Sequence, residues 1–307
     1  MQLNEQLNEL KGFLTQKQCF FKENEPLAPH TSFKVGGPAD LWAEPLNERM
    51  LAHIIAFCTA REIPVTVLGN GSNVLVSDLG VAGAVLHIGG GFCEKERLSA
   101  FELRCGAGTK LSVLCSFALE NELGGLEFAW GIPGTAGGAL YMNAGAYGSE
   151  MANVVTECSC VLTDGRTEVL PLQKLKLGYR TSLFKEKKNR IITAITYRLA
   201  AAPPAEIRGR MEQLMARRRE KQPLEYPSAG STFKRPAGHF AGSLIESCGL
   251  KGFTVGGAAV SEKHAGFVIN KGGATAGDIR SLIEQVQEKV FLETSVRLEP
   301  EVEFIGR

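Results

Sequence analysis

Residues 67–78, VLGNGSNVLVSD, decide the fold, because an apolar strand leads into a Gly-Asn-Gly-Ser-Asn loop and then directly into a second strand. Glycine reaches positive φ at little steric cost, so Gly69 and Gly71 can turn successive N–H groups toward an anion such as a diphosphate. The loop lacks the Lys-Ser/Thr pair of a P-loop, and Val74 stands where a GxGxxG turn has its third glycine. A tight β-hairpin is the alternative, since Asn and Gly dominate hairpin turns.

A second glycine-rich stretch, WGIPGTAGGALYMNAGAYG, occupies residues 130–148. Residues 128–148 carry no charge, but their six glycines, Pro133 and Asn143 argue against a membrane helix. We expect this loop to offer many free N–H groups and little side-chain bulk, so that a flat ring or a phosphate could lie against it. A glycine-rich packing turn is the alternative. Two such loops in one N-terminal unit fit one extended ligand, such as a dinucleotide, better than two small ones.

Composition indicates an ordinary globular protein of two or three folding units. The chain has 307 residues, 22% of them charged, and a net charge of +1, which gives no case for a nucleic-acid or membrane-surface partner. The opening segment, MQLNEQLNELKGF, contains acidic residues and no apolar core. A signal peptide is therefore not expected, and the cytoplasm is the predicted location.

Cysteine and histidine patterns predict neither disulfides nor a metal site. The eight cysteines form no CxxC pair and lie mostly in apolar segments, so we expect reduced core residues. The five histidines show no metal-ligand spacing. Met211 and Met215 are interpreted as core residues of a helix, and the three arginines at 217–219 as a mostly solvated face with positive potential.

Apolar periodicity predicts the main elements. Helical stripes cover residues 51–58, and 111–118 with an end at the Gly124-Gly125 pair. Residues 275–278, Thr-Ala-Gly-Asp, are typical of a helix N-cap and precede a long stripe over residues 279–290. A strand and a turn are expected within residues 30–40, and a turn at 163–166. Further strands are expected at 65–68, 157–161, 190–199 and 302–305.

Residues 201–204, Ala-Ala-Pro-Pro, are typical of a linker, and we place the main domain boundary there. A helical stripe follows, with Ile207, Met211 and Leu214 on one face. The chain therefore divides into a long N-terminal part that holds both glycine loops and a shorter C-terminal part.

Six segments, in this order, resemble a single protein family: HTSFKVGGPAD (30–40), VLGNGSNVLVSD (67–78), GIPGTAGGALYMNAGAYG (131–148), GYRTSLFK (178–185), AGSTFKRP (229–236) and LEPEVEFIG (298–306). They are similar to the UDP-N-acetylenolpyruvoylglucosamine reductases, FAD enzymes that make UDP-N-acetylmuramate for bacterial peptidoglycan. The first three segments also resemble the FAD-binding domain of many flavin oxidases and dehydrogenases. The last three are particular to the reductases, and the resemblance runs from about residue 28 to the end of the chain.

The resemblance implies an α+β fold, with an N-terminal two-lobed FAD-binding domain of the vanillyl-alcohol-oxidase/PCMH type and a C-terminal α+β substrate-binding domain. We expect an N-terminal segment over residues 1–29 and a substrate-binding domain over 205–307. Between them lies the FAD-binding domain, 30–200, with lobes at about 30–90 and 91–200. Only 121 positions separate Arg180 from Glu301, too few for the extra tyrosine loop of the longer subtype, so we assign the shorter one.

The resemblance also implies the ligands. FAD is the implied cofactor and NADPH the implied co-substrate. In the implied ping-pong cycle, NADPH leaves before the enolpyruvyl sugar nucleotide enters. The sequence agrees, because it contains no second dinucleotide motif that would give NADPH a separate site. The residues implied to hold the FAD diphosphate are Gly69, Asn70, Gly71, Ser72 and Asn73. Those implied to line the flavin are Pro133, Gly134, Thr135, Gly137, Gly138, Asn143, Ala144 and Gly145. Lys221 and Tyr179 are assigned to substrate binding.

Three residues carry the chemistry that the resemblance implies. Hydride transfer to the methylene carbon of the enolpyruvyl group leaves negative charge, which Arg180 and Glu301 stabilise, Glu301 as a protonated donor, while Ser231 delivers a proton. The sequence pattern alone would favour a turn hydroxyl for Ser231, a surface ion pair for Arg180 and a solvated strand face for Glu301.

Two other functions stay open. An FAD-dependent oxidase or dehydrogenase of the same fold would keep both glycine loops, but it has no reason to carry the last three motifs together. A non-catalytic sensor of a nucleotide sugar would bind no flavin. Only small-molecule substrates are expected as partners: no nucleic acid, no membrane and no obligate protein partner.

Overall fold

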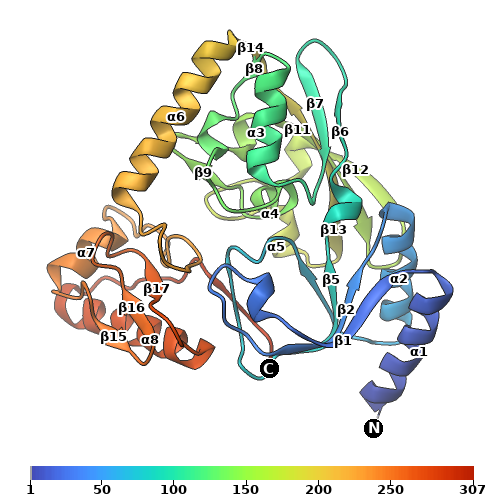
Figure 1. Cartoon of the computed structure of the whole chain (residues 1–307), viewed down its shortest axis with the longest axis horizontal. Coiled ribbons are helices and arrows are strands. Elements are labelled where there is room, and N and C mark those ends of the chain that lie inside the picture. The colour runs from blue at the N-terminus through green and yellow to red at the C-terminus, as the bar shows by residue number, and fades with distance from the viewer. Residues whose placement is uncertain (1) are drawn as a thin grey trace. The chain divides into compact units, whose positions relative to one another are not determined.

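The structure is a computed structural model that describes residues 2–307 (Figure 1). Contacts within the chain define two compact units. The first comprises residues 2–23, 41–70 and 83–216, and the second comprises 24–40, 71–82 and 217–307. Each unit has a hydrophobic core of its own, as the composition predicts.

These units are divided differently from the predicted domains. The proposed linker at 201–204 is ordered within the first unit, where β14 (Ala200–Ala201) pairs with β8 (Leu123–Gly124) and α6 (Pro204–Lys221) begins immediately afterwards. The division falls inside α6 instead, between residues 216 and 217. Residues 30–40 and 71–82, predicted to belong to the FAD-binding domain, group with the C-terminal part, as do residues 24–29 of the predicted N-terminal segment. The assignment of a ligand to each domain stays a prediction.

Two sheets form most of the first unit. The four-stranded sheet has the order β1-β2-β5-β3, and β3 runs parallel to β5, with Val65 opposite Ala84. The five-stranded sheet is antiparallel, in the order β12-β11-β13-β7-β6. The strands are β1 (Phe20–Pro26), β2 (Pro38–Glu44), β3 (Val65–Leu68), β5 (Val81–His87), β6 (Lys95–Arg97), β7 (Glu102–Gly106), β11 (Val155–Leu162), β12 (Thr167–Pro171) and β13 (Arg190–Arg198). The predicted strands at 65–68, 157–161 and 190–199 are confirmed.

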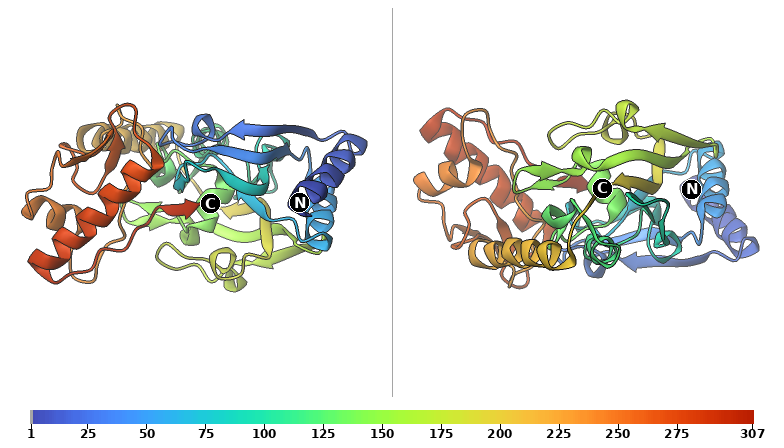
Figure 2. Two further views of the ribbon diagram at one scale, coloured as in Figure 1. Left: turned by 90° about the horizontal axis from the view of Figure 1, so that it is seen from below. Right: turned by 90° about the horizontal axis from the view of Figure 1, so that it is seen from above.

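The helices of the first unit cover these sheets. α1 and α2 lie side by side (Figure 2). α2 begins at an Asn47 cap that accepts from the N–H of Met50 at 2.9 Å, and it buries the predicted stripe. α3 ends at Glu120, before the predicted Gly124-Gly125 stop, because Glu122 turns to a φ of 58°. The bounds are α1 (Gln2–Gln16), α2 (Glu48–Ala60), α3 (Leu111–Glu120), α4 (Ala136–Tyr141) and α5 (Leu183–Glu186), with short strands β9 (Gly145–Ala146) and β10 (Ser149–Glu150).

The second unit is built around α8 (Ala276–Thr294), which packs on the antiparallel sheet β15-β16-β17 (Figure 1). The predicted cap is confirmed, since Thr275 and Asp278 form a reciprocal capping box. The predicted stripe of Ile279, Leu282, Ile283, Val286 and Val290 is fully buried. The remaining bounds are α7 (Ala241–Ser247), β15 (Thr254–Val255), β16 (Ala258–Val260), β17 (Val268–Asn270), β4 (Val74–Val76) and β18 (Glu303–Ile305).

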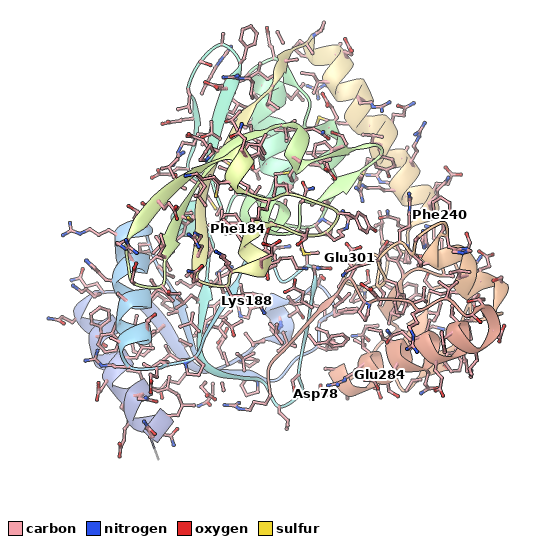
Figure 3. All side chains as sticks on the ribbon, turned by 180° about the vertical axis from the view of Figure 1, so that it is seen from behind. Asp78, Phe184, Lys188, Phe240, Glu284 and Glu301 are labelled. Atoms are coloured by element: carbon pink, nitrogen blue, oxygen red, sulfur yellow. The ribbon has the colours of Figure 1, made fainter. Side chains whose placement is uncertain are left out.

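The strands on either side of the Gly69–Asn73 loop, residues 69–73, do not pair with each other. β3 pairs with β5, whereas β4 pairs in parallel with β18, with Glu303 opposite Val74. The hairpin alternative is therefore wrong. Asp78, at the end of this segment, accepts hydrogen bonds from the N–H groups of Ala276 (2.8 Å) and Gly277 (2.9 Å), so it caps α8 (Figure 3). These contacts explain why residues 71–82 belong to the second unit.

All eight cysteines are free thiols, and six of them are buried. Burial raises the pKa of Cys58 and of Cys105 to about 12, which keeps both thiols protonated and unreactive. Within residues 2–307, no helix is long and apolar enough to cross a membrane. The same residues contain no cluster of His, Cys, Asp or Glu suited to a metal ion.

Candidate active site

The first glycine loop has an open backbone. Gly71 has a φ of 58°, and a Cβ at this position would lie 2.1 Å from the carbonyl oxygen of His30, so only glycine fits. Within the described residues, no acceptor receives the N–H groups of Gly69, Asn70, Gly71 or Ser72. Consecutive N–H groups without protein partners are what an anion-binding nest requires.

A serine that sequence reasoning missed borders this loop. The N–H of Ser32 donates to the carbonyl of Gly71 at 3.0 Å. Its hydroxyl is buried and has no hydrogen-bond partner within residues 2–307. A buried hydroxyl without a partner is rare in folded proteins and points to a missing acceptor, such as a phosphate oxygen. The sequence clue was the position of Ser32 inside the HTSFKVGGPAD motif.

The second glycine loop differs from what the sequence predicts. Its backbone N–H groups are largely used inside the protein: Ala136 donates to Thr109 and Gly137 to Ala107, both at 2.8 Å. The expectation of many free N–H groups is therefore wrong, because acceptors within α4 and in residues 107–109 receive these hydrogen bonds. The groups engaged are those of Gly134, Ala136, Gly137, Gly138, Ala139, Met142, Asn143 and Ala144. What the loop offers is a closely packed surface with little side-chain bulk.

Gly69, at the start of the first glycine loop, meets the second glycine loop within the first unit. Thr135 is the N-cap of α4 and accepts from the N–H of Gly138 at 3.3 Å. The same Thr135 oxygen would lie 2.8 Å from a Cβ at Gly69, so the two loops are in direct contact there. Pro133, the first residue of the predicted flavin lining, is exposed. This adjacency is what a single ligand spanning both loops requires.

Arg180 lies in a tight turn of the first unit. Gly178 and Thr181 exchange two backbone hydrogen bonds of 3.2 Å, with Tyr179 and Arg180 at the tip. Arg180 has a left-handed φ of 54°, its guanidinium lies 5.2 Å from the Tyr179 ring centre, and its Nη2 donates to the Gly145 carbonyl at 3.5 Å. Tyr179 itself is 54% exposed and can contact a ligand.

Ser231 and Glu301 come together in the second unit. The N–H of Glu301 donates to the carbonyl of Thr232 at 2.8 Å, so the residue after Ser231 is paired with Glu301. Thr232 is fully buried and accepts from the N–H of Val268 at 2.9 Å, which fixes this segment. Ser231 is exposed and Glu301 is half-buried, so both side chains can reach a ligand (Glu301 is labelled in Figure 3). Arg180 belongs to the first unit.

Basic side chains gather near the end of α6. Lys221, its last residue, is exposed, and the Nζ of Lys263 donates to the carbonyl of Arg219 at 2.7 Å. Arg217 and Arg219 are exposed and Arg218 is buried, in agreement with the mostly solvated face predicted for residues 217–219. Burial lowers the pKa of His264, so this imidazole stays neutral near pH 7.

Comparisons with known proteins separate the remaining alternatives. A model of an FAD binding domain matches residues 39–170, and a model of the UDP-N-acetylenolpyruvoylglucosamine reductase C-terminal domain matches residues 222–305. The chain is 48% identical to the UDP-N-acetylenolpyruvoylglucosamine reductase of Agathobacter rectalis over 295 residues, which cover 92% of this chain and 93% of the relative. It is also 48% identical to the enzyme of that name from Clostridium botulinum over 308 residues, which cover 98% of this chain and 99% of the relative.

The chain belongs to the UDP-N-acetylenolpyruvoylglucosamine reductase family. A solved reductase of this name, from Thermus caldophilus, superposes with a TM-score of 0.79 at 36% identity, over 94% of this chain and 98% of that one.

Membership in the reductase family confirms the predicted family, the oxidoreductase class and the FAD-binding α+β fold with its separate C-terminal domain. It also confirms the predicted role in peptidoglycan synthesis. The residues present fit FAD, because the first loop has N–H groups that no acceptor in the described part of the chain receives, and the buried Ser32 hydroxyl lies beside them. The individual residue roles stay predictions.

Proposed function

We propose that the chain is an NADPH-dependent reductase that converts UDP-N-acetylglucosamine enolpyruvate to UDP-N-acetylmuramate in the cytoplasm, in a ping-pong cycle. The proposal is supported by 48% identity to named reductases over 92% of the chain. The structural observation that carries it is the backbone hydrogen bond that joins Glu301 to the residue following Ser231. When bound, FAD supplies hydride transfer from NADPH to the methylene carbon of the enolpyruvyl group.

The first loop would hold the cofactor by its diphosphate. N–H groups from Gly69 to Ser72 would donate to phosphate oxygens, and Ser32 would add a hydroxyl donor. The second loop, residues 133–145, would give the flavin ring a flat surface, since its glycines leave the backbone exposed to close approach. Its N–H groups are mostly engaged, so this loop would orient the ring by shape.

The remaining residues would act on the substrate. Arg180 would balance the negative charge that develops on the substrate carboxylate, and Glu301 would donate a hydrogen bond to it from a protonated carboxyl group. Ser231 would deliver a proton to the adjacent carbon. Loss of one aimed donor typically costs about 10²–10³ in rate, and loss of a positioned acid about 10²–10⁴. Lys221 and Tyr179, both exposed, would contact the nucleotide diphosphate and sugar.

The decisive experiment separates the two half-reactions under anaerobic conditions. NADPH should bleach the flavin absorbance of the purified protein, and UDP-N-acetylglucosamine enolpyruvate should restore it. In Ser231→Ala, bleaching should proceed normally while restoration slows by roughly 10²–10⁴. Ser243→Ala, which changes an exposed serine on α7, is the matched control and should leave both steps unchanged. Equal slowing of both steps by Ser231→Ala would refute the proton-donor role, and protein that binds no FAD would refute the function.

A further inference from the structure

We infer that Asn73 and Asn143, one from each glycine loop, are positioning residues that hold the backbone next to Glu301 and Arg180. Both asparagines are implied by resemblance to contact FAD, but their side-chain amides bind other parts of the protein. Each loop would therefore fix a catalytic side chain as well as the cofactor. The inference rests on the proposed function, since it takes Arg180 and Glu301 to be catalytic.

The side chain of Asn143 is fully buried and engaged at both ends. Its Nδ2 donates to the carbonyl of Gly178 at 3.0 Å, and its Oδ1 accepts from the N–H of Ala152 at 2.9 Å. Asn143 also has a φ of 43°, a left-handed conformation that asparagine tolerates better than other side chains. Asparagine therefore suits this position in two ways: it tolerates the left-handed backbone, and its amide can both donate and accept a hydrogen bond.

The turn that carries Arg180 needs such support. A left-handed φ at a residue other than glycine is strained and persists only where the surroundings hold it. Asn143 holds the turn before Arg180, and Ser182, also fully buried, holds it after Arg180 by donating to the carbonyl of Tyr141 at 2.7 Å. Both anchors attach the turn to residues 141–143, which lie within the predicted flavin-lining stretch.

Asn73 occupies the equivalent place in the first loop. Its Nδ2 donates to the carbonyl of Glu301 at 3.1 Å, and its own carbonyl accepts from the N–H of Glu303 at 3.0 Å. The N–H of Glu301 is held by Thr232. The peptide groups on both sides of the Glu301 side chain are thus fixed, one by the cofactor loop and the other by the segment of Ser231.

Asn143→Asp isolates the contact of interest. The ionised carboxylate keeps an acceptor for the Ala152 N–H and tolerates the left-handed backbone, but it turns an oxygen toward the Gly178 carbonyl. The Gly178 carbonyl keeps the Thr181 N–H but loses the Asn143 donor that ties the turn to the second loop. This loss should slow reoxidation of reduced enzyme by the enolpyruvyl substrate by about 2- to 12-fold. Because burial favours the protonated acid, which can donate to that carbonyl, the effect should grow as the assay pH is raised. FAD affinity and the rate of reduction by NADPH should fall less than the rate of reoxidation. Ser182→Ala, which removes the other anchor, should slow the same step.

A double-mutant cycle distinguishes positioning from general loss of structure. If Asn143 acts through Arg180, Asn143→Asp should cause no further slowing in an Arg180→Ala background. For the first loop, Asn73→Asp should likewise lose its effect in a Glu301→Gln background. Additive losses in the Arg180→Ala background would overturn the inference while leaving the proposed function intact. If Arg180→Ala alone reoxidised normally, the proposed role of Arg180 would fail instead.

Two further outcomes of the Asn143→Asp experiment also test the inference. An Asn143→Asp protein that folds but has lost FAD would overturn the inference, because it would assign the amide to cofactor binding. If Asn143→Asp does not fold, Ser182→Ala takes its place in the cycle with Arg180→Ala. Its effect must then vanish in that background for the inference to stand.

Discussion

The two glycine loops share a composition but use it for different physical purposes. In the first, Gly71 supplies a left-handed backbone and a close approach to His30, and consecutive N–H groups find no acceptor among residues 2–307. In the second, Gly137 has no positive φ, and its N–H is engaged; it is needed because a Cβ would lie 2.8 Å from the Cβ of Ala107. One loop is therefore suited to bind an anion and the other to pack tightly beneath a flat ring.

The loops agree in one respect, which composition does not reveal. Each contains an asparagine whose amide holds another segment in its own unit, Asn73 toward Glu301 and Asn143 toward Gly178. Glycine therefore shapes the ligand surface in both loops, and asparagine connects that surface to the expected catalytic residues.

The largest expected effect comes from Gly71→Ala. The left-handed backbone alone costs a residue with a Cβ about 1–2 kcal/mol, and the His30 carbonyl leaves no space, so the loop must change conformation. FAD affinity should fall at least about tenfold, as measured by titration of flavin into stripped protein. Gly138→Ala, whose Cβ would meet nothing closer than 3.5 Å, should lower the affinity far less. Equal losses in the two variants would mean that the loops bind the cofactor in the same way.

Gly137→Ala should instead reduce stability. Overpacking a buried site typically costs about 1–3 kcal/mol in unfolding free energy, and the neighbour here, Ala107, is a short side chain that cannot move aside. Urea unfolding of the flavin-free protein is the measurement. The adjacent Gly138→Ala is the control, and it should be neutral or slightly stabilising, because alanine is preferred over glycine within a helix. An unchanged urea midpoint for Gly137→Ala would argue against the packing role.

Elements governed by local chemistry were predictable from the sequence. The α8 cap at Thr275 and its buried stripe follow from residues within a few positions of one another, and so does the β3 strand. The division of the chain into units did not follow, because it depends on the pairing of β4 with β18 and on the contact of Asp78 with α8, between residues about 200 positions apart.

For the site, the motifs point to the two loops and to Arg180, Ser231 and Glu301, whose roles stay predictions. Only the fold shows which backbone N–H groups are engaged. The prediction of free N–H groups in the second loop was wrong because carbonyls of residues 107–109, which carry no motif, accept hydrogen bonds from it. Ser32 was missed because a single serine in a turn is usually unremarkable until burial removes its access to water.

Ser32→Ala provides the smallest and most specific test of the difference between the loops. If the Ser32 hydroxyl donates to a phosphate oxygen of FAD, its loss should weaken FAD binding by about 0.5–1.5 kcal/mol, roughly 2- to 12-fold. The stability of the flavin-free protein should not fall, because removing a buried hydroxyl that has no partner relieves a desolvation cost. Ser281→Ala, at a half-buried serine that already accepts from Gln285, is the matched control and should leave FAD affinity unchanged. Weaker flavin binding with unchanged or higher stability would assign the Ser32 hydroxyl to cofactor binding. Lower stability with unchanged flavin binding would instead assign the hydroxyl to the fold. The anion site would then consist of the N–H groups of the first loop alone.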